Sequence, residues 1–276
     1  MKKIDKLFSS SKTIDIDKNS RIVIMSDCHR GDGNNEDSFL KNEVIFNGAL
    51  KQYFKGGYTY IELGDGDELW EVDDIEYIIA SHKSSYKILD NFYKQDRLYM
   101  IVGNHDLKKL NNKKMYNKYL ENLEVYESLI LNYDGISIFL IHGHQVDLMN
   151  SKLAFISKFM VRHVWKYLER FGINDPTSAA KNNKLSEFTH NELIKFSNTK
   201  NVIVISGHTH KPSLDKNQLY ANSGSCVHPN GITAIEIEHG YLNLVRWKMD
   251  ANGEGTAKVV REKISSVSIN NLINSS

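Results

Sequence analysis

Short runs of branched apolar residues alternate along the chain with segments of helical spacing. Four such runs are present, at residues 21–26, 58–63, 98–102 and 202–206. Continuous apolar runs of this length are typical of strands that are buried on both faces of a sheet. Residues 39–55 and 74–93 have the spacing of amphipathic helices, and the first ends at Gly56-Gly57, a common helix stop. Strands that alternate with helices predict an α/β fold.

Two hairpins are predicted in the second half of the chain. Residues 123–131 and 136–141 flank the turn Tyr133-Asp134-Gly135. Residues 232–237 and 241–247 flank His239-Gly240 in the same way. Turn residues between two apolar runs favour antiparallel pairing of those runs.

The remaining segments set the predicted domain organisation. Residues 145–200 are helical in pattern and poor in strand signals, which predicts a helical, lid-like insertion between two strands. Residues 251–276 are polar, and we expect them to form a loose tail. The chain shows no internal repeat and no linker rich in Pro, Gly or Ser. We therefore expect residues 1–250 to form a single domain.

Composition narrows the classes of protein that fit. Of the 276 residues, 41% are hydrophobic and 25% are charged, which is ordinary for a soluble globular protein. Lys and Arg together number 35, against 34 for Asp and Glu. A near-neutral chain has no overall field that would attract a nucleic-acid backbone. We therefore expect no nucleic-acid partner and only local recognition of phosphate.

The cysteines and the first residues bear on location. Cys28 and Cys226 are the two cysteines, and they form no C-x-x-C pair. The opening residues, Met1-Lys2-Lys3 and the polar stretch after them, do not resemble a secretory signal. These features favour a reducing cytoplasm. Because no apolar run approaches the roughly 20 residues of a membrane span, we expect at most a peripheral membrane contact.

The first candidate chemical motif is Asp27-Cys28-His29, directly after the first apolar run. In an extended segment alternate side chains share a face, so Asp27 and His29 would point the same way. A carboxylate and an imidazole at the carboxyl end of a strand can form half of a metal site. Taken alone the motif is weak, because Asp-x-His is common by chance.

Four more polar clusters follow apolar runs. They are Gly64-Asp65-Gly66-Asp67-Glu68, Gly103-Asn104-His105-Asp106, His142-Gly143-His144 and Gly207-His208-Thr209-His210. Each one could be an ordinary turn or cap. Together with the first motif they would converge on one edge of a sheet, and the five motifs contain six of the eleven histidines. Their Asp, His and Asn side chains form a mixed oxygen and nitrogen set that suits Mn, Fe or Zn.

This ordered series resembles the calcineurin-like metallophosphoesterase superfamily over roughly residues 21 to 225. The resemblance implies a four-layer sandwich, in which two mixed β-sheets pack face to face between helices. It also implies two divalent metal ions, with Mn as the first expectation and Fe or Zn as alternatives. The implied ligands are Asp27, His29 and His210 for one ion, Asn104, His142 and His208 for the other, and Asp65 as a bridge.

The resemblance assigns catalytic roles to the third motif. His105 would contact the scissile phosphate and protonate the leaving oxygen, and Asp106 would orient the His105 ring. A water shared by the two metal ions would attack phosphorus in line. The implied activity is hydrolysis of a phosphate ester or a pyrophosphate without a covalent phospho-enzyme.

Residues 64–70 are also similar to the equivalent stretch of UDP-2,3-diacylglucosamine hydrolases, as is a helical insertion after the fourth motif. The chain departs from that subfamily at His144, where Asp is common, and at His105, where many members carry Arg. A related branch with another nucleotide-linked or lipid-linked substrate would fit both observations.

Several residues outside the ligand set are candidates for substrate contact. Arg30 could grip a second phosphate, although Arg30-Gly31-Asp32-Gly33 also fits a tight turn. His144 could be a ligand, a supporting neighbour of the ligands or a loop residue, and we favour the supporting role. Arg162 and Lys166 belong to a basic stripe of the insertion that recurs at every fourth residue, at Lys158, Arg162, Lys166 and Arg170. The stripe is either a solvated helix face or a lid for an anionic substrate or lipid surface.

Three functions are consistent with these patterns. The first is hydrolysis of a phosphorylated small-molecule or lipid-linked substrate, with a pyrophosphate as the leading case. The second is removal of phosphate from phosphoproteins or small phosphomonoesters. The third is a metal-binding scaffold without catalysis, which the intact motifs argue against. The sequence predicts no particular oligomeric state.

Overall fold

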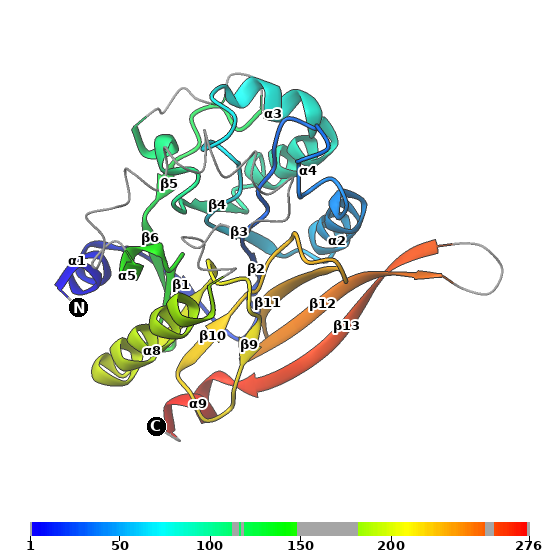
Figure 1. The fold of residues 1–276 in the computed structure, drawn as a ribbon. Helices are drawn as coiled ribbons and strands as arrows, with labels where there is room; N and C mark the ends of the chain where they lie inside the picture. The colour runs from blue at the N-terminus through cyan, green and yellow to red at the C-terminus, as the bar shows by residue number, and fades with distance from the viewer. Residues whose placement is uncertain (1, 112–115, 117–118, 148–181, 252–256, 275–276) are drawn as a thin grey trace.

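The computed structural model describes residues 2–111, 116, 119–147, 182–251 and 257–274. In these residues the strands form two mixed sheets (Figure 1). One sheet has the strand order β1-β6-β7-β8-β10-β9 and the other has the order β13-β12-β11-β2-β3-β4-β5.

The seven-stranded sheet is built on parallel strands that carry three of the predicted motifs. Strands β2 (Arg21–Met25), β3 (Thr59–Leu63), β4 (Leu98–Ile101) and β5 (Val125–Tyr126) lie parallel in that order. On the other side of β2, strands β11 (Ile232–Glu238), β12 (Tyr241–Ala251) and β13 (Ala257–Ser268) continue the sheet in antiparallel pairs. The hairpin predicted at His239-Gly240 is confirmed by the pairing of β11 with β12.

The six-stranded sheet carries the other two motifs. Strands β1 (Lys12–Ile16), β6 (Ser128–Tyr133), β7 (Ile136–Ile141) and β8 (Ile203–Ser206) lie side by side. The short strands β10 (Tyr220–Asn222) and β9 (Ser213–Leu214) complete it. Strands β6 and β7 form the hairpin predicted at Asp134-Gly135. The run 123–131 is not one strand, however, because its first part is β5 of the other sheet.

Alternation of side chains along β2 explains the layering. Ile22 and Ile24 face the second sheet and pack in the core between the two sheets. Val23 and Met25 face the opposite side and pack under helices. This period of two is what a strand buried on both faces requires. The two sheets therefore share one apolar core, and each has a second core on its outer face.

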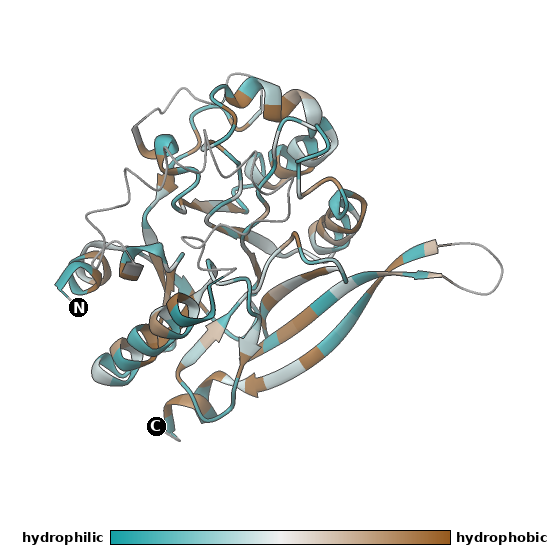
Figure 2. Ribbon diagram, in the orientation of Figure 1, coloured by the Kyte–Doolittle hydropathy of each residue, from teal (hydrophilic) through white to brown (hydrophobic). Residues whose placement is uncertain are grey.

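Helices cover both outer faces, which confirms the predicted four layers. Helices α2 (Glu43–Lys55), α3 (Ile75–Ser81) and α4 (Lys83–Tyr93) pack on the seven-stranded sheet. Helices α1 (Lys2–Ser10), α5 (His144–Asp147) and α8 (Asn183–Lys200) pack on the other. Helix α8 alternates brown and teal along its length in Figure 2, as a helix with one buried face should. A 3₁₀ turn, η1 (Leu107–Asn111), follows the third motif.

The prediction of a loose tail after residue 250 is wrong. Strand β13 pairs with β12 along its whole length, and helix α9 (Ile269–Asn274) follows it. Val267, Ile269 and Leu272 are buried in the core between the sheets. The segment is polar because β13 is an edge strand with mostly exposed side chains, and edge strands commonly carry charges.

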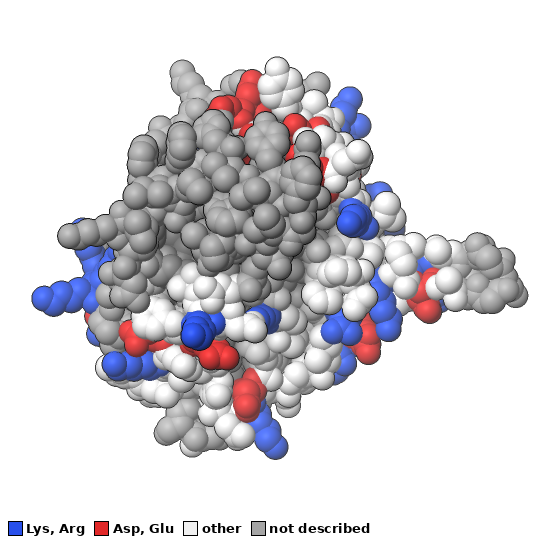
Figure 3. Space-filling model, viewed as in Figure 1, with Lys and Arg blue, Asp and Glu red and all other residues white. Residues whose placement is uncertain are grey.

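The described surface carries both signs of charge. Lys and Arg side chains are interspersed with Asp and Glu on the described part of the face in Figure 3. Of the helices that the structure describes, none combines the length and the apolar character needed to cross a membrane.

The helix predicted over residues 74–93 is broken at His82, whose side chain is fully buried. Its Nε2 lies 2.7 Å from Asp37 Oδ2, and its Nδ1 lies 3.3 Å from Glu43 Oε2. Asp37 also accepts hydrogen bonds from the backbone N–H groups of Gly31 and Gly33. His82 thus secures the loop that follows the first motif.

The stability of the fold should depend on pH through His82. Burial lowers the pKa of its imidazole, but Asp37 and Glu43 outweigh burial and raise it from 6.5 to about 9. The resulting stabilisation is complete below pH 6.5 and is lost as the pH rises through 9. We expect His82→Gln to cost a few kcal/mol at pH 6, since each pKa unit is worth about 1.4 kcal/mol.

The measurement is urea unfolding of both proteins in chelator, so that metal binding adds no pH dependence of its own. The difference in unfolding free energy between wild type and His82→Gln should shrink toward about pH 10. His228→Gln, at an exposed histidine, serves as the control. A difference that stays constant from pH 6 to 10 would show that the two carboxylates do not hold His82 protonated.

Candidate metal centre and active site

All five predicted motifs lie at the carboxyl ends of strands. Asp27 follows β2, Asp65 follows β3 and Asn104 follows β4, and these three strands are parallel neighbours in one sheet. His142 follows β7 and His208 follows β8, which are parallel neighbours in the other sheet. Since the carboxyl ends of parallel strands meet at one edge, the side chains from both sheets converge on one centre.

The backbone of these motifs is held in an uncommon conformation. Positive φ values between 49° and 67° occur at five of their residues, namely Asp27, His29, Asp65, His208 and His210. A positive φ strains a non-glycine residue by about 1–3 kcal/mol and is concentrated at functional sites. The left-handed turns redirect the chain after β2, β3 and β8 and bring side chains from these strands toward a common point.

Two glycines permit the close approach of neighbouring motifs. Gly64 has a φ of +86°, and a Cβ at this position would lie 2.4 Å from Nδ1 of His142. A Cβ at Gly103 would lie 2.1 Å from Oδ1 of Asp65. Both distances are too short for non-bonded atoms, so only glycine lets His142 and Asp65 occupy their positions.

Asp27 and Asp65 each have one carboxylate oxygen that accepts a hydrogen bond from a backbone N–H group. Asp27 Oδ2 accepts a hydrogen bond from the N–H of His208 at 2.9 Å. Asp65 Oδ1 accepts one from the N–H of His105 at 2.8 Å. The second oxygen of each carboxylate, Asp27 Oδ1 or Asp65 Oδ2, is turned toward the imidazoles.

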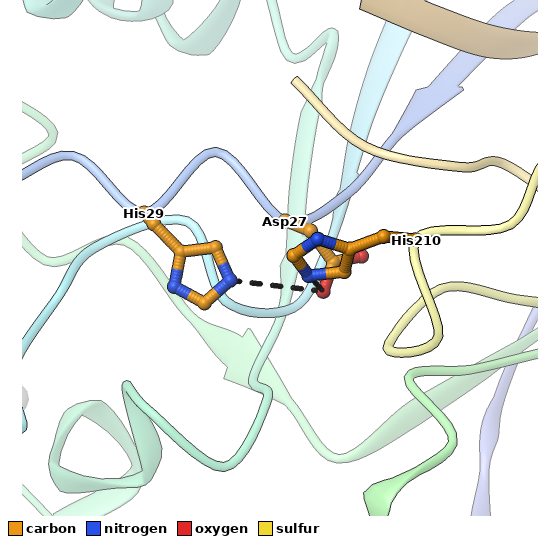
Figure 4. A group of neighbouring side chains, drawn as sticks. All are labelled: Asp27, His29 and His210. Atoms are coloured by element: carbon orange, nitrogen blue, oxygen red, sulfur yellow. Dashed lines mark ion pairs between the residues drawn. The ribbon is translucent and has the colours of Figure 1, made fainter. Parts of the chain in front are cut away.

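Asp27, His29 and His210 form one group of possible metal ligands (Figure 4). Asp27 Oδ1 lies 3.1 Å from Nε2 of His210 and 3.9 Å from Nε2 of His29. One ligand atom from each residue lies within 4.8 Å of the others. These are the three residues that the family resemblance assigns to the first metal ion.

Asp65, His142 and His208 form the second group. Asp65 Oδ2 lies 3.1 Å from Nε2 of His142 and 3.9 Å from Nε2 of His29. It therefore lies between the two groups, where a bridging carboxylate has to be. Nδ1 of His142 donates to the carbonyl oxygen of Leu63 at 2.8 Å, which leaves Nε2 to face the centre.

Buried polar atoms without partners test whether metal ions fit here. Asp27 Oδ1, His29 Nε2, Asn104 Oδ1 and His142 Nε2 are buried and have no hydrogen-bond partner among the described residues. Such groups are costly unless something binds them. An oxygen and nitrogen donor set of this kind fits divalent Mn, Fe or Zn. The residues present therefore fit the implied group.

The charges at the centre are mutually dependent. Burial raises the pKa of Asp27, but the nearby His210 and His142 outweigh burial and lower it to about 2. Burial lowers the pKa of His142, but Asp65 and Asp27 raise it to about 10. The carboxylates are therefore ionised and ready to bind cations, whereas His142 must release a proton to do so.

His105 lies beside the two ligand groups. Its Nε2 is 4.0 Å from Asp65 Oδ2, and its Nδ1 donates to Oε1 of Glu68 at 2.7 Å. Trp70 stacks on its ring, with centroids 4.1 Å apart and an interplanar angle of 21°. Burial lowers the pKa of His105, but Glu68 and Asp65 raise it to about 9. A protonated imidazole at this point is placed to donate a proton.

The family model for calcineurin-like phosphoesterases matches residues 20–212, more than half of the 276-residue chain. The chain belongs to the calcineurin-like phosphoesterase family. It is a phosphoesterase of a family that uses divalent metal ions. No match was found among curated protein sequences.

Solved structures resemble this calcineurin-like phosphoesterase at low sequence identity. A predicted phosphoesterase from Streptococcus pneumoniae TIGR4 is 17% identical with a TM-score of 0.40, over 88% of this chain and 98% of that chain. Vps29 from Chaetomium thermophilum is 13% identical with a TM-score of 0.46, over 90% and 98%. An archaeal phosphodiesterase is 14% identical with a TM-score of 0.38, over 88% and 99%. None of these values bears on the substrate.

The predicted role of Asp106 is wrong. Its Oδ1 accepts from the N–H of Gly103, and its Oδ2 accepts from the N–H of Gly66 and from Nζ of Lys109. None of these contacts involves His105. The His105 ring is hydrogen-bonded to a different carboxylate, that of Glu68. Asp106 instead ties the second and third motifs together. Sequence reasoning missed Glu68, although it lies in the second motif, because nothing in the motif marks which histidine it reaches.

The prediction that Arg30 binds substrate is also wrong. The Arg30 side chain is fully buried. Its Nη1 and Nη2 donate to both oxygens of Glu62, and its Nε donates to Asp67 at 2.7 Å. Asp67 also forms an ion pair with Lys109, with Nζ 2.8 Å from Oδ2. Arg30 thus belongs to a buried charge network formed by Arg30, Glu62, Asp67, Asp106 and Lys109.

Replacing Arg30 should therefore affect the fold more than substrate affinity. We expect Arg30→Met to lower the unfolding free energy by about 3–5 kcal/mol, because Glu62 and Asp67 would lose their buried partner. Urea unfolding in chelator measures this loss, and Arg21→Met, at a half-exposed arginine, is the control. A variant of normal stability with a raised KM would restore the substrate-binding role.

His144 lies against the second ligand group. Its ring centroid is 5.5 Å from that of His142 and 6.4 Å from that of His208, and its side chain is buried. Burial, reinforced by His142 and His208, holds the pKa of His144 well below its usual range. The side chain is not part of any ligand group found among the described residues. The supporting role of His144 stays a prediction.

Arg162 and Lys166 lie outside the described residues, as does the rest of the basic stripe. Their predicted contact with substrate stays a prediction. The N-terminal end of the insertion is described as helix α5, which begins at His144 in the site. Its C-terminal end is described as helix α8. Lys211, next to His210, donates to Oδ1 of Asn183 in the first turn of α8.

Proposed function

We propose that this phosphoesterase hydrolyses phosphate esters or pyrophosphates with two divalent metal ions bound at the shared sheet edge. The observation that carries the proposal is a set of buried donor atoms at the ends of neighbouring strands that have no hydrogen-bond partner in the described part of the chain: Asp27 Oδ1, His29 Nε2, Asn104 Oδ1 and His142 Nε2. Two ligand groups meet there with Asp65 between them. Such an arrangement suits two cations that share a bridging carboxylate.

The residues of the site would have separate roles in metal binding and proton transfer. Asp27, His29 and His210 would hold one ion, Asn104, His142 and His208 the other, and Asp65 would bridge them. When bound, the ions supply an activated water and draw charge from the phosphate. His105 would protonate the leaving oxygen through Nε2, because Nδ1 is occupied by Glu68. His144 would stay neutral and pack against His142 and His208.

Mn is the first candidate for the metal, and Fe and Zn are alternatives, because mixed imidazole, amide and carboxylate sites accept all three. Elemental analysis after reconstitution with each metal should give close to two equivalents per chain. The ligand atoms are too many for one site that also keeps open positions for water and substrate. One equivalent at saturation would contradict the dinuclear assignment.

The proposed substrate is a nucleotide-linked or lipid-linked pyrophosphate. The support is the similarity of residues 64–70 to UDP-2,3-diacylglucosamine hydrolases and the helical insertion after the fourth motif. In that stretch, Glu68 and Trp70 both contact the predicted proton donor, so the similarity covers residues at the centre. Peripheral contact with a membrane would rest on the basic stripe.

The deciding experiment is a screen of the Mn-loaded protein against p-nitrophenyl phosphate, bis-p-nitrophenyl phosphate and UDP-sugars. Cleavage of UDP-sugars would support the pyrophosphate assignment. Turnover of p-nitrophenyl phosphate alone would favour a phosphomonoesterase. A protein with two bound metal ions and no turnover of any substrate would favour a non-catalytic scaffold.

The insertion gives a separate test of substrate class. Reversing Arg162 and Lys166 to Glu should raise KM for a UDP-linked or lipid-linked substrate. It should leave KM for bis-p-nitrophenyl phosphate unchanged, because that substrate is small. If the protein binds anionic liposomes, added salt should weaken that binding, and so should the double substitution. If both substrates and liposome binding are unaffected, the stripe is a solvated helix face.

A further inference from the structure

Glu68 lies in the second motif with its backbone fixed on both sides. Its N–H donates to the carbonyl of Arg30 at 2.9 Å, and its own carbonyl accepts from the N–H of Val72 at 3.0 Å. The residue is 9% exposed. The loop therefore sets the direction in which the side chain of Glu68 leaves the backbone.

That carboxylate contacts histidines from two other motifs. Oε2 accepts from Nδ1 of His29 at 2.8 Å, and Oε1 accepts from Nδ1 of His105 at 2.7 Å. A glutamate side chain is ordinarily ionised at neutral pH. An ionised carboxylate can only accept. Both imidazoles must therefore carry a proton on Nδ1 and direct Nε2 toward the centre.

We propose that Glu68 is a positioning residue that sets the ring orientation and the Nδ1 proton of a metal ligand, His29, and of the proton donor, His105, at the same time. The proposal rests on the proposed function and deepens it. One side chain then couples the binding of one metal ion to the placement of the group that protonates the leaving oxygen.

Two further contacts restrict His105. Trp70 covers one face of the ring at 4.1 Å, and the His29 ring meets it edge to face at 4.7 Å with an interplanar angle of 88°. Glu68 holds the ring in its own plane, whereas Trp70 and His29 limit its tilt. Of these three neighbours, only Glu68 selects which nitrogen faces Asp65.

The choice of substitution follows from the number of acceptors. Gln at position 68 would have nearly the same shape but one acceptor oxygen and one NH₂ donor. It could keep the Nδ1–H bond of one histidine but not of both. Ala would release both rings. Glu121→Gln, at an exposed glutamate, is the matched control.

The primary test is nuclear magnetic resonance of ¹⁵N-histidine-labelled, metal-free protein. His29→Asn and His105→Asn identify the two rings by loss of their signals. In wild type and in Glu121→Gln, both Nδ1 atoms should carry protons that are protected from exchange with water. Glu68→Gln should lose this protection at one ring and Glu68→Ala at both. Unchanged protection in the folded Glu68→Gln protein would overturn the proposal.

Metal binding and kinetics supply the functional readouts. The Mn affinity of Glu68→Gln should fall about 10–100-fold, the usual effect of losing a carboxylate that supports a metal-bound histidine. Its kcat should fall more for phenyl phosphate than for p-nitrophenyl phosphate, because a misplaced His105 matters most for a poor leaving group. A purely structural role would lower the melting temperature and leave the leaving-group dependence as in wild type, contradicting the positioning role.

The two proposals fail in different ways. If the wild-type protein binds two metal ions but hydrolyses nothing, the proposed function fails while the protection of both Nδ1 protons is still measurable. If the wild-type protein is active and Glu68→Gln keeps both protected protons and the wild-type leaving-group dependence, only the role of Glu68 fails.

Discussion

Asp65→Ala should abolish hydrolysis and weaken the binding of both metal ions. The carboxylate lies between the two ligand groups, with Oδ2 3.1 Å from His142 and 3.9 Å from His29. Its other oxygen fixes the backbone at His105. We expect kcat to fall at least about 10³-fold, since the loss of one transition-state hydrogen bond already costs 10²–10³-fold. Elemental analysis should find clearly fewer than two Mn per chain.

Asp65→Asn separates charge from shape. The amide oxygen can still accept from the N–H of His105, but the charge that two cations would share is lost. We expect this variant to keep the fold of the third motif and still to bind metal poorly. Asp250→Ala, at an exposed position of β12, is the control. Full turnover with two metal ions in Asp65→Ala would rule out the bridge.

His105→Ala should lower kcat by about 10²–10⁴-fold, the usual range for a lost general acid. Metal content should stay near the wild-type value, because the two ligand groups remain complete without His105. The loss should be smaller for p-nitrophenyl phosphate than for phenyl phosphate, since nitrophenolate leaves with little need for a proton. Steady-state kinetics with both esters and elemental analysis of the same samples provide the measurement.

Two outcomes would contradict the role of His105 as an acid. An equal loss for both esters would indicate a role in binding or structure. Loss of metal would indicate a ligand, because His29, Asp65 and His105 also lie close enough to hold an ion. His228→Ala, at an exposed histidine, should leave metal content and kcat as in wild type.

The convergence of the site was predictable from the sequence because it depends on local signals. Each motif directly follows an apolar run, and parallel strands deliver their carboxyl ends to one edge. Asp27, Asp65 and His142 therefore meet even though they come from different sheets. The runs themselves were found because strands buried on both faces are continuously apolar.

The partners of side chains within the motifs were not predictable in the same way. Asp106 and Arg30 were assigned by their closeness in sequence to His105 and His29. The backbone turns at these motifs, so a side chain next to a ligand in the sequence need not point toward the centre. The side chains of Arg30 and Asp106 enter the buried charge network instead. Glu68 reaches His29 and His105 only because several left-handed turns bring separate loops together.

Elements at the sheet edge were missed for a different reason. Strand β13 has few buried side chains, so its sequence lacks the apolar pattern that identifies a strand. Strand β1 and helix α1 are similarly polar, and they are held by pairing with β6 and by a few buried residues such as Ile4 and Leu7. Pairing with a neighbour, rather than burial, defines these strands.

The left-handed backbone at the loops of the proposed metal centre limits which residues can replace the proposed ligands during evolution. Among residues other than glycine, Asn, Asp and His adopt positive φ several-fold more often than the rest. Asp27, His29, Asp65, His208 and His210 all have positive φ, and all are of these types. Glu or Cys could in principle bind the same metals, but both are less suited to this backbone. Each of these five positions would thus be restricted by chain geometry as well as by metal chemistry, and exchange among Asp, Asn and His is the substitution that the backbone tolerates best.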